Sequence, residues 1–184
     1  MRKQNNVGGV IAALNNKKAR YVVGIDPDIG KSGVCMIDKD AKEITDLCAL
    51  SFPVLAGVLQ KWGEMYGEDM CVYIELPQSE HNWQIAARAR YARNPVSYAA
   101  NAGVDVGRCR EVAISLKEWC DYHHVQADTV NPLVKIWGGG KEKINAKEFS
   151  SVTGWIGRTN SEMRDAGLLA WYYSNLPIKV KSGK

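Results

Sequence analysis

The sequence has little of what a zinc site or a disulfide framework requires. Its 184 residues include three histidines and five cysteines, and no two cysteines have the CxxC spacing of a zinc ligand pair. An odd number of cysteines, most of them in apolar runs, indicates buried reduced thiols in an intracellular protein. These residues are His81, His123, His124, Cys35, Cys48, Cys71, Cys109 and Cys120.

Long hydrophobic segments are also lacking. The only apolar stretch near the N-terminus, 7–14, is too short to span a bilayer and has no small-residue cleavage site after it. We therefore expect no membrane insertion, no secretion and a cytoplasmic location. There are no internal repeats, and the length suits one hydrophobic core. We expect a single domain over 20–184, preceded by a tail or short appended element over 1–19.

The chain carries a small excess of positive charge. Its formal net charge is +4 and its pI is about 8.7. This suits a partner that carries phosphates, but many soluble proteins are equally basic, so the charge alone favours nucleic acid only slightly.

The first half of the chain has the pattern of strands followed by a helix and a further strand. Strands are predicted at 21–26, 34–38 and 44–52, with a glycine-rich turn between the first two. After Pro53, apolar residues recur at helical spacing, which predicts an amphipathic helix with a buried stripe. The stripe consists of Leu55, Val58, Leu59, Trp62 and Met65. The apolar run 70–76 then predicts a strand buried on both faces.

The second half predicts three helices and one strand. A long helix is expected over 95–122, a strand over 125–130, and helices over 145–153 and 160–175. Gly103 and Gly107 lie inside the long helix, where each costs about 1 kcal/mol relative to alanine, so we expect another backbone to approach them closely. An interrupted helix is the alternative. The whole pattern is that of an α/β domain.

Two acidic residues lie at the ends of predicted strands. Asp26 ends the first strand and is followed by Pro27, which cannot donate to a β-ladder. The carboxyl edge of an α/β sheet is where ligands bind. A plain turn aspartate is the alternative for Asp26, and Asp28 and Gly30 are expected to serve the turn itself. Glu75 lies in an apolar strand, so it must either face a partner or cation or reach solvent at the edge.

A second acidic pair lies in the predicted last helix. Glu162 and Asp165 are three residues apart, which places both carboxylates on one face. Thr159 and Glu162 also have the spacing of a capping box, in which Glu162 would bind the Thr159 amide. Asp165 lies past the first turn, so capping does not explain it.

Four converging carboxylates would favour bound cations. Two carboxylates about 5 Å apart repel by about 3 kcal/mol at an effective dielectric near 20. Oxygen-only ligands suit Mg²⁺ or Mn²⁺. Two such ions about 4 Å apart can activate a water and stabilise the leaving oxygen in phosphodiester cleavage. The sequence therefore predicts a two-metal phosphodiesterase site.

The ordered motifs resemble the RuvC family of Holliday-junction resolvases. The segments are GIDPDIGKSG, VYIELP, NPVSYAANAGVDVGRCREVAISLKEW, NPLVKIWGGGKEKINAKEF and EMRDAGLLAW, which together span nearly all of 21–173. The resemblance implies a ribonuclease H-like fold: a mixed five-stranded sheet with strand 2 antiparallel and helices on both faces. It also implies a homodimer that nicks four-way DNA junctions, with the helix over 96–122 at the dimer interface and no small-molecule substrate. Such proteins act in the cytoplasm of a bacterial or phage-infected cell.

The resemblance also assigns roles to individual residues. Asp26, Glu75, Glu162 and Asp165 match the family's ligands for two Mg²⁺ ions. Lysines near the penultimate helix approach the scissile phosphate in the family, and Lys135 and Lys143 match them best, with Lys141 as a competitor.

Three positions depart from the family pattern. Glu162 replaces the usual aspartate, and Asp28 stands where glycine is common. Gln78 stands where an aromatic side chain often wedges between junction bases, and Trp83 or His81 is the candidate replacement.

The stretch 81–95 combines basic and aromatic residues. Arg88, Arg90 and Arg93 lie among Trp83 and Tyr91, a mixture suited to tracking phosphates and stacking bases. A solvated face with a buried aromatic is the alternative. The loop 138–143 suits phosphate binding by backbone amides and lysines, or is a plain linker.

Three other functions remain open on the sequence. GIDPDIGKSG also resembles the first phosphate loop of actin-like ATPases, but those proteins need two such domains. A non-catalytic DNA-binding scaffold would not need four acids. A ribonuclease H-like nuclease acting on hybrid, flap or other branched nucleic acid would need them.

Overall fold

A five-stranded mixed sheet forms the centre of the computed structural model, which describes residues 18–77, 85, 89–133 and 143–178. The strand order is β3-β2-β1-β4-β5; β2 pairs antiparallel with β1 and β3, whereas β1, β4 and β5 are parallel. The predicted sheet is confirmed. The strands are β1 (Tyr21–Asp26), β2 (Ser32–Asp38), β3 (Glu43–Leu50), β4 (Met70–Glu75) and β5 (Ala127–Val130).

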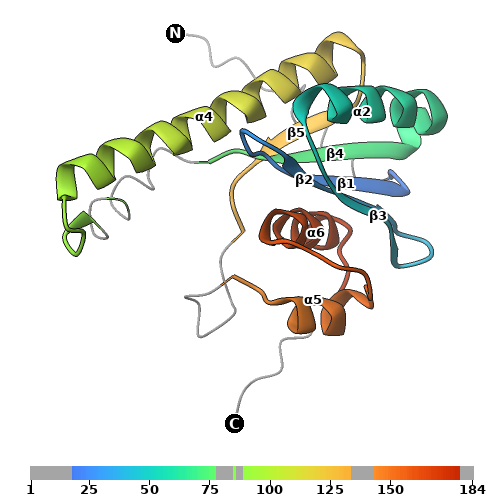
Figure 1. Ribbon diagram of the computed structural model, residues 1–184. Helices are drawn as coiled ribbons and strands as arrows, with labels where there is room; N and C mark the ends of the chain where they lie inside the picture. Colours follow the sequence, from blue (N-terminus) through green and yellow to red (C-terminus); the bar gives the residue numbers. More distant parts are fainter. Residues whose placement is uncertain (1–17, 78–84, 86–88, 134–142, 179–184) are drawn as a thin grey trace, which may run out of the picture.

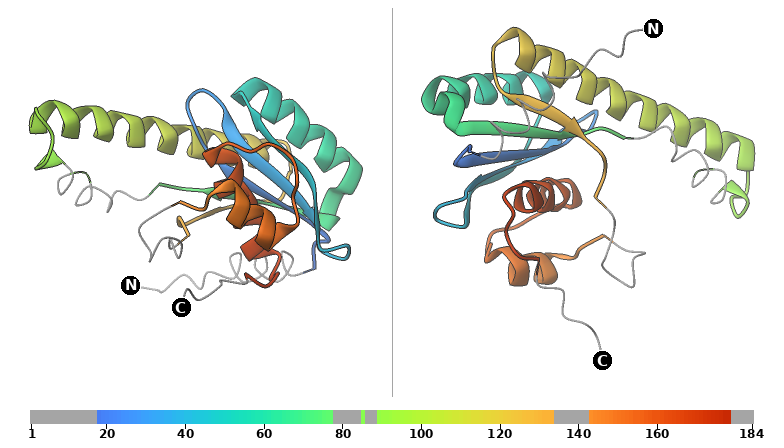
Figure 2. Two further views of the ribbon diagram at one scale, coloured as in Figure 1. Left: turned by 60° about the horizontal axis from the view of Figure 1, so that its bottom comes forward. Right: turned by 180° about the vertical axis from the view of Figure 1, so that it is seen from behind.

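Helices cover both faces of this sheet. Figures 1 and 2 show α2 and α4 over one face, α6 against the other face, and α5 beyond α6. The predicted two-sided arrangement is therefore confirmed. The helices are α2 (Phe52–Tyr66), α4 (Pro95–Tyr122), α5 (Ala146–Thr153) and α6 (Ser161–Tyr173), with a short 3-10 helix, η1 (Gly67–Asp69), before β4.

Side-chain alternation divides the core into two layers. Val23 and Val72 pack on the α2 and α4 side, while Val22 and Tyr73 pack on the α6 side. Because successive strand residues point to opposite faces, a central strand with helices on both sides must be apolar throughout. This explains the uninterrupted apolar run of β4, whose first five residues are buried.

Helix α2 confirms the predicted helix but corrects one residue of its buried stripe. Leu55 and Leu59 are fully buried, whereas Met65 is 69% exposed. Ala56 is also buried, which rotates the buried face of the helix away from Met65. Met65 was therefore wrongly assigned to the core.

Helix α4 is continuous, so the alternative of an interrupted helix is wrong. Its buried residues, Ala113, Leu116 and Cys120, all lie in its C-terminal half. Its N-terminal half projects beyond the sheet (Figures 1 and 2). Apart from the neighbouring turns of the helix itself, no atom of the described residues lies within 4 Å of a Cβ built on Gly103 or Gly107, so the predicted close backbone is not found in the described part of the chain.

Two further expectations concern the chain end and the cysteines. Of the predicted tail, 1–17 lies outside the described residues, and Ala19 is fully buried in the core. All five cysteines are free: three are buried and two, Cys48 and Cys109, are partly buried, as predicted for reduced thiols. Among the described residues, no helix has the length and hydropathy needed to cross a membrane.

Candidate active site

Two strand glycines allow α6 to lie directly on the sheet. A Cβ built on Gly24 of β1 would lie 2.6 Å from the amide nitrogen of Ala170. One built on Gly33 of β2 would lie 2.9 Å from the amide nitrogen of Met163 and would overlap the carbonyl group of Glu162. No larger residue fits at either position without moving the helix. The helix backbone therefore crosses β1 and β2 in close contact.

Strand register places the two strand-end acids beside each other on the face that α6 covers. Residues an even number of positions apart in a strand point to the same face, so Asp26 points with Val22 and Glu75 points with Tyr73. Val22 and Tyr73 both pack toward α6. Ile25 pairs with Ile74 in the parallel β1–β4 ladder, so the next residues, Asp26 and Glu75, are neighbours at the carboxyl ends. Neither acid is the isolated turn or edge residue considered as an alternative.

The same register brings the start of α6 to Asp26. Asp26 pairs with Gly33 across the β1–β2 ladder, and Gly33 contacts the Glu162 backbone. Glu162 lies in the first turn of α6 and Asp165 one turn further. The helix thus brings its acidic pair to the strand ends, whereas the spacing of Glu162 and Asp165 predicted only that the two share a helix face.

The alternative of a capping box between Thr159 and Glu162 is wrong. The N-cap of α6 is Asn160, whose Oδ1 accepts a hydrogen bond from the Met163 amide at 2.8 Å. Glu162 instead accepts a hydrogen bond of 2.6 Å from the Ser161 hydroxyl. That bond is the main reason that the pKa of Glu162 is lowered, with Lys143 and Arg164 adding smaller effects. Glu162 is therefore not held in a capping box with Thr159.

Asp28 and Gly30 form the turn after β1, as expected. The Asp28 carboxylate accepts a hydrogen bond of 2.9 Å from the Gly30 amide, and the Asp28 amide donates to the Ser32 hydroxyl at 3.2 Å. These bonds stabilise the tight return from β1 to β2. Asp28 thus has a local structural role beside the site.

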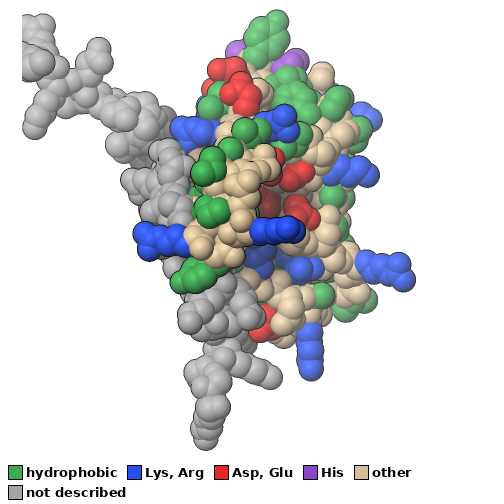
Figure 3. Space-filling model, turned by 60° about the vertical axis from the view of Figure 1, so that its left-hand side comes forward, with side chains coloured by type: hydrophobic (Ala, Val, Ile, Leu, Met, Phe, Trp, Pro, Cys, Tyr) green, Lys and Arg blue, Asp and Glu red, His purple; other side chains and the backbone are tan. Residues whose placement is uncertain are grey.

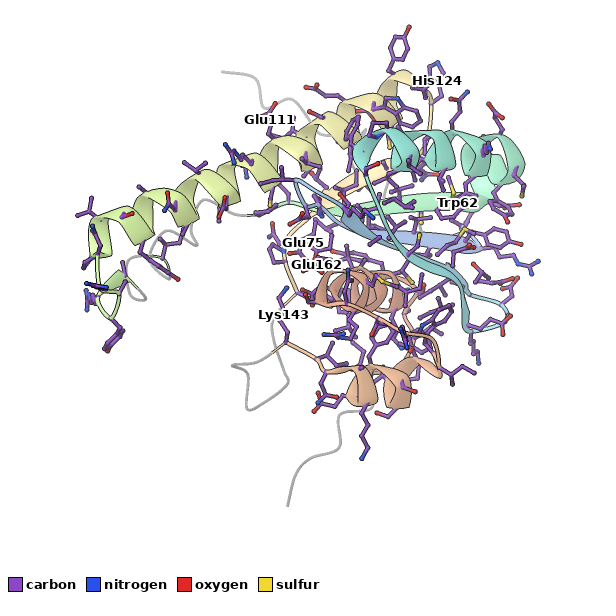
Figure 4. The ribbon with its side chains drawn as sticks, viewed as in Figure 1. Trp62, Glu75, Glu111, His124, Lys143 and Glu162 are labelled. Atoms are coloured by element: carbon purple, nitrogen blue, oxygen red, sulfur yellow. The ribbon has the colours of Figure 1, made fainter. Side chains whose placement is uncertain are left out.

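Lys143 supplies a positive charge to the acidic group. Its ammonium forms an ion pair with Asp165, and the Lys143 side chain is 47% exposed. Burial alone would lower the pKa of Lys143, but the hydrogen bond to Asp165 and the charges of Asp165, Asp26 and Glu162 raise it above its usual value. Figure 4 shows Glu75, Glu162 and Lys143 at the same end of the sheet, far from His124.

Asp26 is a carboxyl group whose charged form is disfavoured by its surroundings. Its pKa is raised to about 8, mainly by burial, with the charges of Glu75, Asp165 and Glu162 adding to the shift and Lys143 opposing it. Each of the other three acids therefore lies close enough to influence Asp26. Figure 3 shows acidic side chains in a hollowed part of the surface with lysine and arginine side chains around them.

The donor chemistry of this group fits hard divalent cations. Its ligand atoms are carboxylate oxygens only, which suits Mg²⁺ or Mn²⁺, and among the described residues Lys143 places its ammonium against one of these carboxylates. Bound cations would relieve the repulsion that raises the pKa of Asp26. In the described part of the chain, no three acidic, histidine or cysteine side chains are already arranged around a common point.

Some predicted DNA-contacting residues fall outside the site or outside the described residues. Arg90, Tyr91 and Arg93 are exposed just before α4, and Tyr91 is 93% exposed, so the alternative of a buried aromatic is wrong there. The predicted residues that lie outside the described ranges are Arg88, Trp83, Lys135, Lys141, Gln78 and His81.

Sequence reasoning missed two arginines near the site. Arg110 of α4 donates a hydrogen bond of 2.9 Å to the carbonyl oxygen of Pro77, just after Glu75. Arg164 of α6 binds backbone carbonyl groups on both sides of α5. No local sequence pattern indicates that an arginine binds a distant backbone group, so these two contacts could be identified only in the folded structure.

No family model matches this sequence, and no curated protein matches it. The fold is similar to that of T. thermophilus RuvC in complex with a Holliday junction substrate. The TM-score is 0.51 at 16% sequence identity, and the match covers 82% of this chain and 89% of that chain. The similarity establishes a ribonuclease H-like fold.

Proposed function

We propose that this protein is a metal-dependent, structure-selective DNA endonuclease that makes paired nicks in four-way junctions. The observation that carries the proposal is the placement of α6 on Gly24 and Gly33. This packing brings Glu162 and Asp165 to the carboxyl ends of β1 and β4, where Asp26 and Glu75 are neighbours. The proposed cofactor is Mg²⁺, two ions per site, with Mn²⁺ as a substitute.

The residues of the site have separate roles in this proposal. Asp26, Glu75, Glu162 and Asp165 hold the cations, which when bound would activate water and stabilise the leaving oxygen. Lys143 has an exposed ammonium beside these acids, so it is suited to bind a phosphate oxygen of the substrate. Lys135 and Lys141 are proposed to extend this phosphate contact.

The shape and charge of the molecule support the proposed substrate and assembly. Exposed Arg90, Tyr91 and Arg93 suit a DNA backbone and unstacked bases. The projecting half of α4 carries exposed Val96 and Val104 next to the open Gly103 and Gly107, which suits a second copy of the chain. A homodimer supplies the two sites that paired nicks on a two-fold symmetric junction require.

Cleavage of labelled substrates would test the proposal. The panel contains a four-way junction, a linear duplex of the same sequence, a 5′ flap and an RNA–DNA hybrid, each with Mg²⁺, Mn²⁺ or EDTA. We expect symmetric nicks in the junction with either metal and no cleavage in EDTA. Faster cleavage of the flap or hybrid would instead assign a different ribonuclease H-like nuclease. Junction binding without cleavage in either metal would indicate a non-catalytic scaffold.

A further inference from the structure

Lys143 belongs to a segment that is fixed on its C-terminal side. The next residue, Ile144, is 1% exposed and packs in the core on the α6 face. Asn145 then caps α5 through a capping box with Glu148, in which the Glu148 amide donates to Asn145 Oδ1 at 3.0 Å. The backbone position of Lys143 is thus set by what holds Ile144.

Arg164 holds that segment from α6. Its Nε donates a hydrogen bond of 2.9 Å to the carbonyl oxygen of Ile144. Its Nη1 donates to the carbonyl oxygen of Thr159 at 3.2 Å and to the Thr159 hydroxyl at 3.1 Å. One guanidinium therefore joins the residue that precedes the N-cap of α5 to the residue that precedes the N-cap of α6.

Two consecutive residues of α6 thus bind two consecutive residues of the segment before α5. Arg164 binds the backbone of Ile144, and Asp165 binds the side chain of Lys143. A long, half-exposed lysine side chain has much rotamer freedom, so a fixed backbone is needed for its ammonium to stay at one carboxylate. The forked, planar guanidinium makes all three bonds at once, which a lysine ammonium on a single stem does not reproduce.

We infer that Arg164 is a positioning residue, which fixes the Ile144 carbonyl group so that the Lys143 ammonium remains at Asp165. The catalytic part of this inference rests on the proposed nuclease function. Its structural part, that Arg164 restrains the Lys143 segment, is independent of any activity.

Amide hydrogen exchange tests the structural part in the full-length, metal-free protein. We expect Arg164→Ala to raise exchange of the amides over 143–146 by about tenfold or more, because bonds from a charged donor are lost. Exchange in β1 and β4 should stay unchanged. Arg158→Ala, which removes an exposed arginine from the loop between α5 and α6, is the matched control and should change neither region. Unchanged exchange over 143–146 in Arg164→Ala would overturn the inference.

A double-mutant cycle tests the catalytic part. Arg164→Ala should lower the cleavage rate at saturating junction DNA by about tenfold, change DNA affinity much less, and be partly rescued in Arg164→Lys. In a Lys143→Ala background, Arg164→Ala should lower the rate no further, because its effect passes through Lys143. Multiplicative losses in the double variant would overturn this role.

The two experiments separate the failure of each claim. If the wild-type protein cleaves no substrate in Mg²⁺ or Mn²⁺, the proposed function fails and the catalytic role of Arg164 fails with it. The exchange experiment still decides whether Arg164 restrains Lys143. If Arg164→Ala unfolds the chain, Arg164→Lys supplies both readouts, with a smaller rise in exchange over 143–146 expected.

Discussion

Gly33 of β2 lies directly against the backbone of Glu162 in α6, so that a side chain at Gly33 would overlap the Glu162 carbonyl group. The contact joins the sheet to the first turn of the helix, where the acidic pair begins. Because Gly33 also pairs with Asp26, this contact, together with that of Gly24, sets the position of the helix acids relative to the strand acids.

Gly33→Ala should therefore lower both stability and cleavage. The added methyl group forces the start of α6 away from β2, at a cost of about 1–3 kcal/mol in the free energy of unfolding. Gly57→Ala is the matched control: Gly57 lies in α2 with no atom within 4 Å of a built Cβ, so alanine should stabilise the protein by about 0.5–1 kcal/mol. Urea unfolding and junction cleavage measure both effects. Equal stability of the two variants would contradict the described contact.

Asp26 should make the metal-free protein less stable as pH rises. Its pKa in the folded chain is about 8, above its ordinary value of 3.8, so between these values the folded state holds a proton that the unfolded state lacks. Stability from this group is therefore present below about pH 4 and is lost as pH rises to about 8, by up to about 1 kcal/mol per pH unit. Denaturation in EDTA at pH 5 to 8 measures this slope.

Two variants isolate the contribution of Asp26 to that slope. Asp26→Asn should flatten it and raise stability at pH 8, since the buried amide needs no proton to remain neutral. Asp69→Asn, in the exposed η1 helix, should leave the slope unchanged. If the free energy of unfolding of Asp26→Asn depends on pH as steeply as that of the wild type, Asp26 is not the group responsible for this dependence.

Asp165→Asn should separate DNA binding from cleavage. The change retains the shape of the side chain but removes a proposed metal ligand, so the cleavage rate should fall by roughly a hundredfold or more. Junction affinity in EDTA should stay the same or increase, because one negative charge near the phosphates is removed. Asp46→Asn on β3 is the control, because it removes the same single negative charge outside the site. Full activity of Asp165→Asn would remove Asp165 from the site.

Val104→Glu should dissociate the proposed dimer. Val104 is 51% exposed on the projecting half of α4, where a buried charge would oppose association. Val54→Glu on α2 is a matched control, because Val54 is 52% exposed on a different surface. Light scattering at tens of micromolar, with and without junction DNA, gives the masses. A wild-type protein that is monomeric in both conditions would contradict the dimer itself.

Local sequence patterns were enough to predict the strand-end positions of Asp26 and Glu75 and the shared helix face of Glu162 and Asp165. These follow from local rules: a proline after Asp26 ends its strand, and residues three apart on a helix face the same side. The ordered motifs further implied a mixed five-stranded sheet with its second strand antiparallel, which the structure confirms. What the local rules could not supply was the distance between elements.

Which side chains contact each other depends on the tertiary structure. Asn160 caps α6 in place of Thr159 because capping depends on the backbone angles where the helix begins, and sequence spacing does not fix these angles. Met65 is exposed because the packing of Ala56 sets the rotation of α2. The contacts of Gly33 with Glu162, Lys143 with Asp165 and Arg164 with Ile144 join residues far apart in the chain, or separated by a helix. Such contacts depend on how closely two elements pack, which is a property of the assembled core.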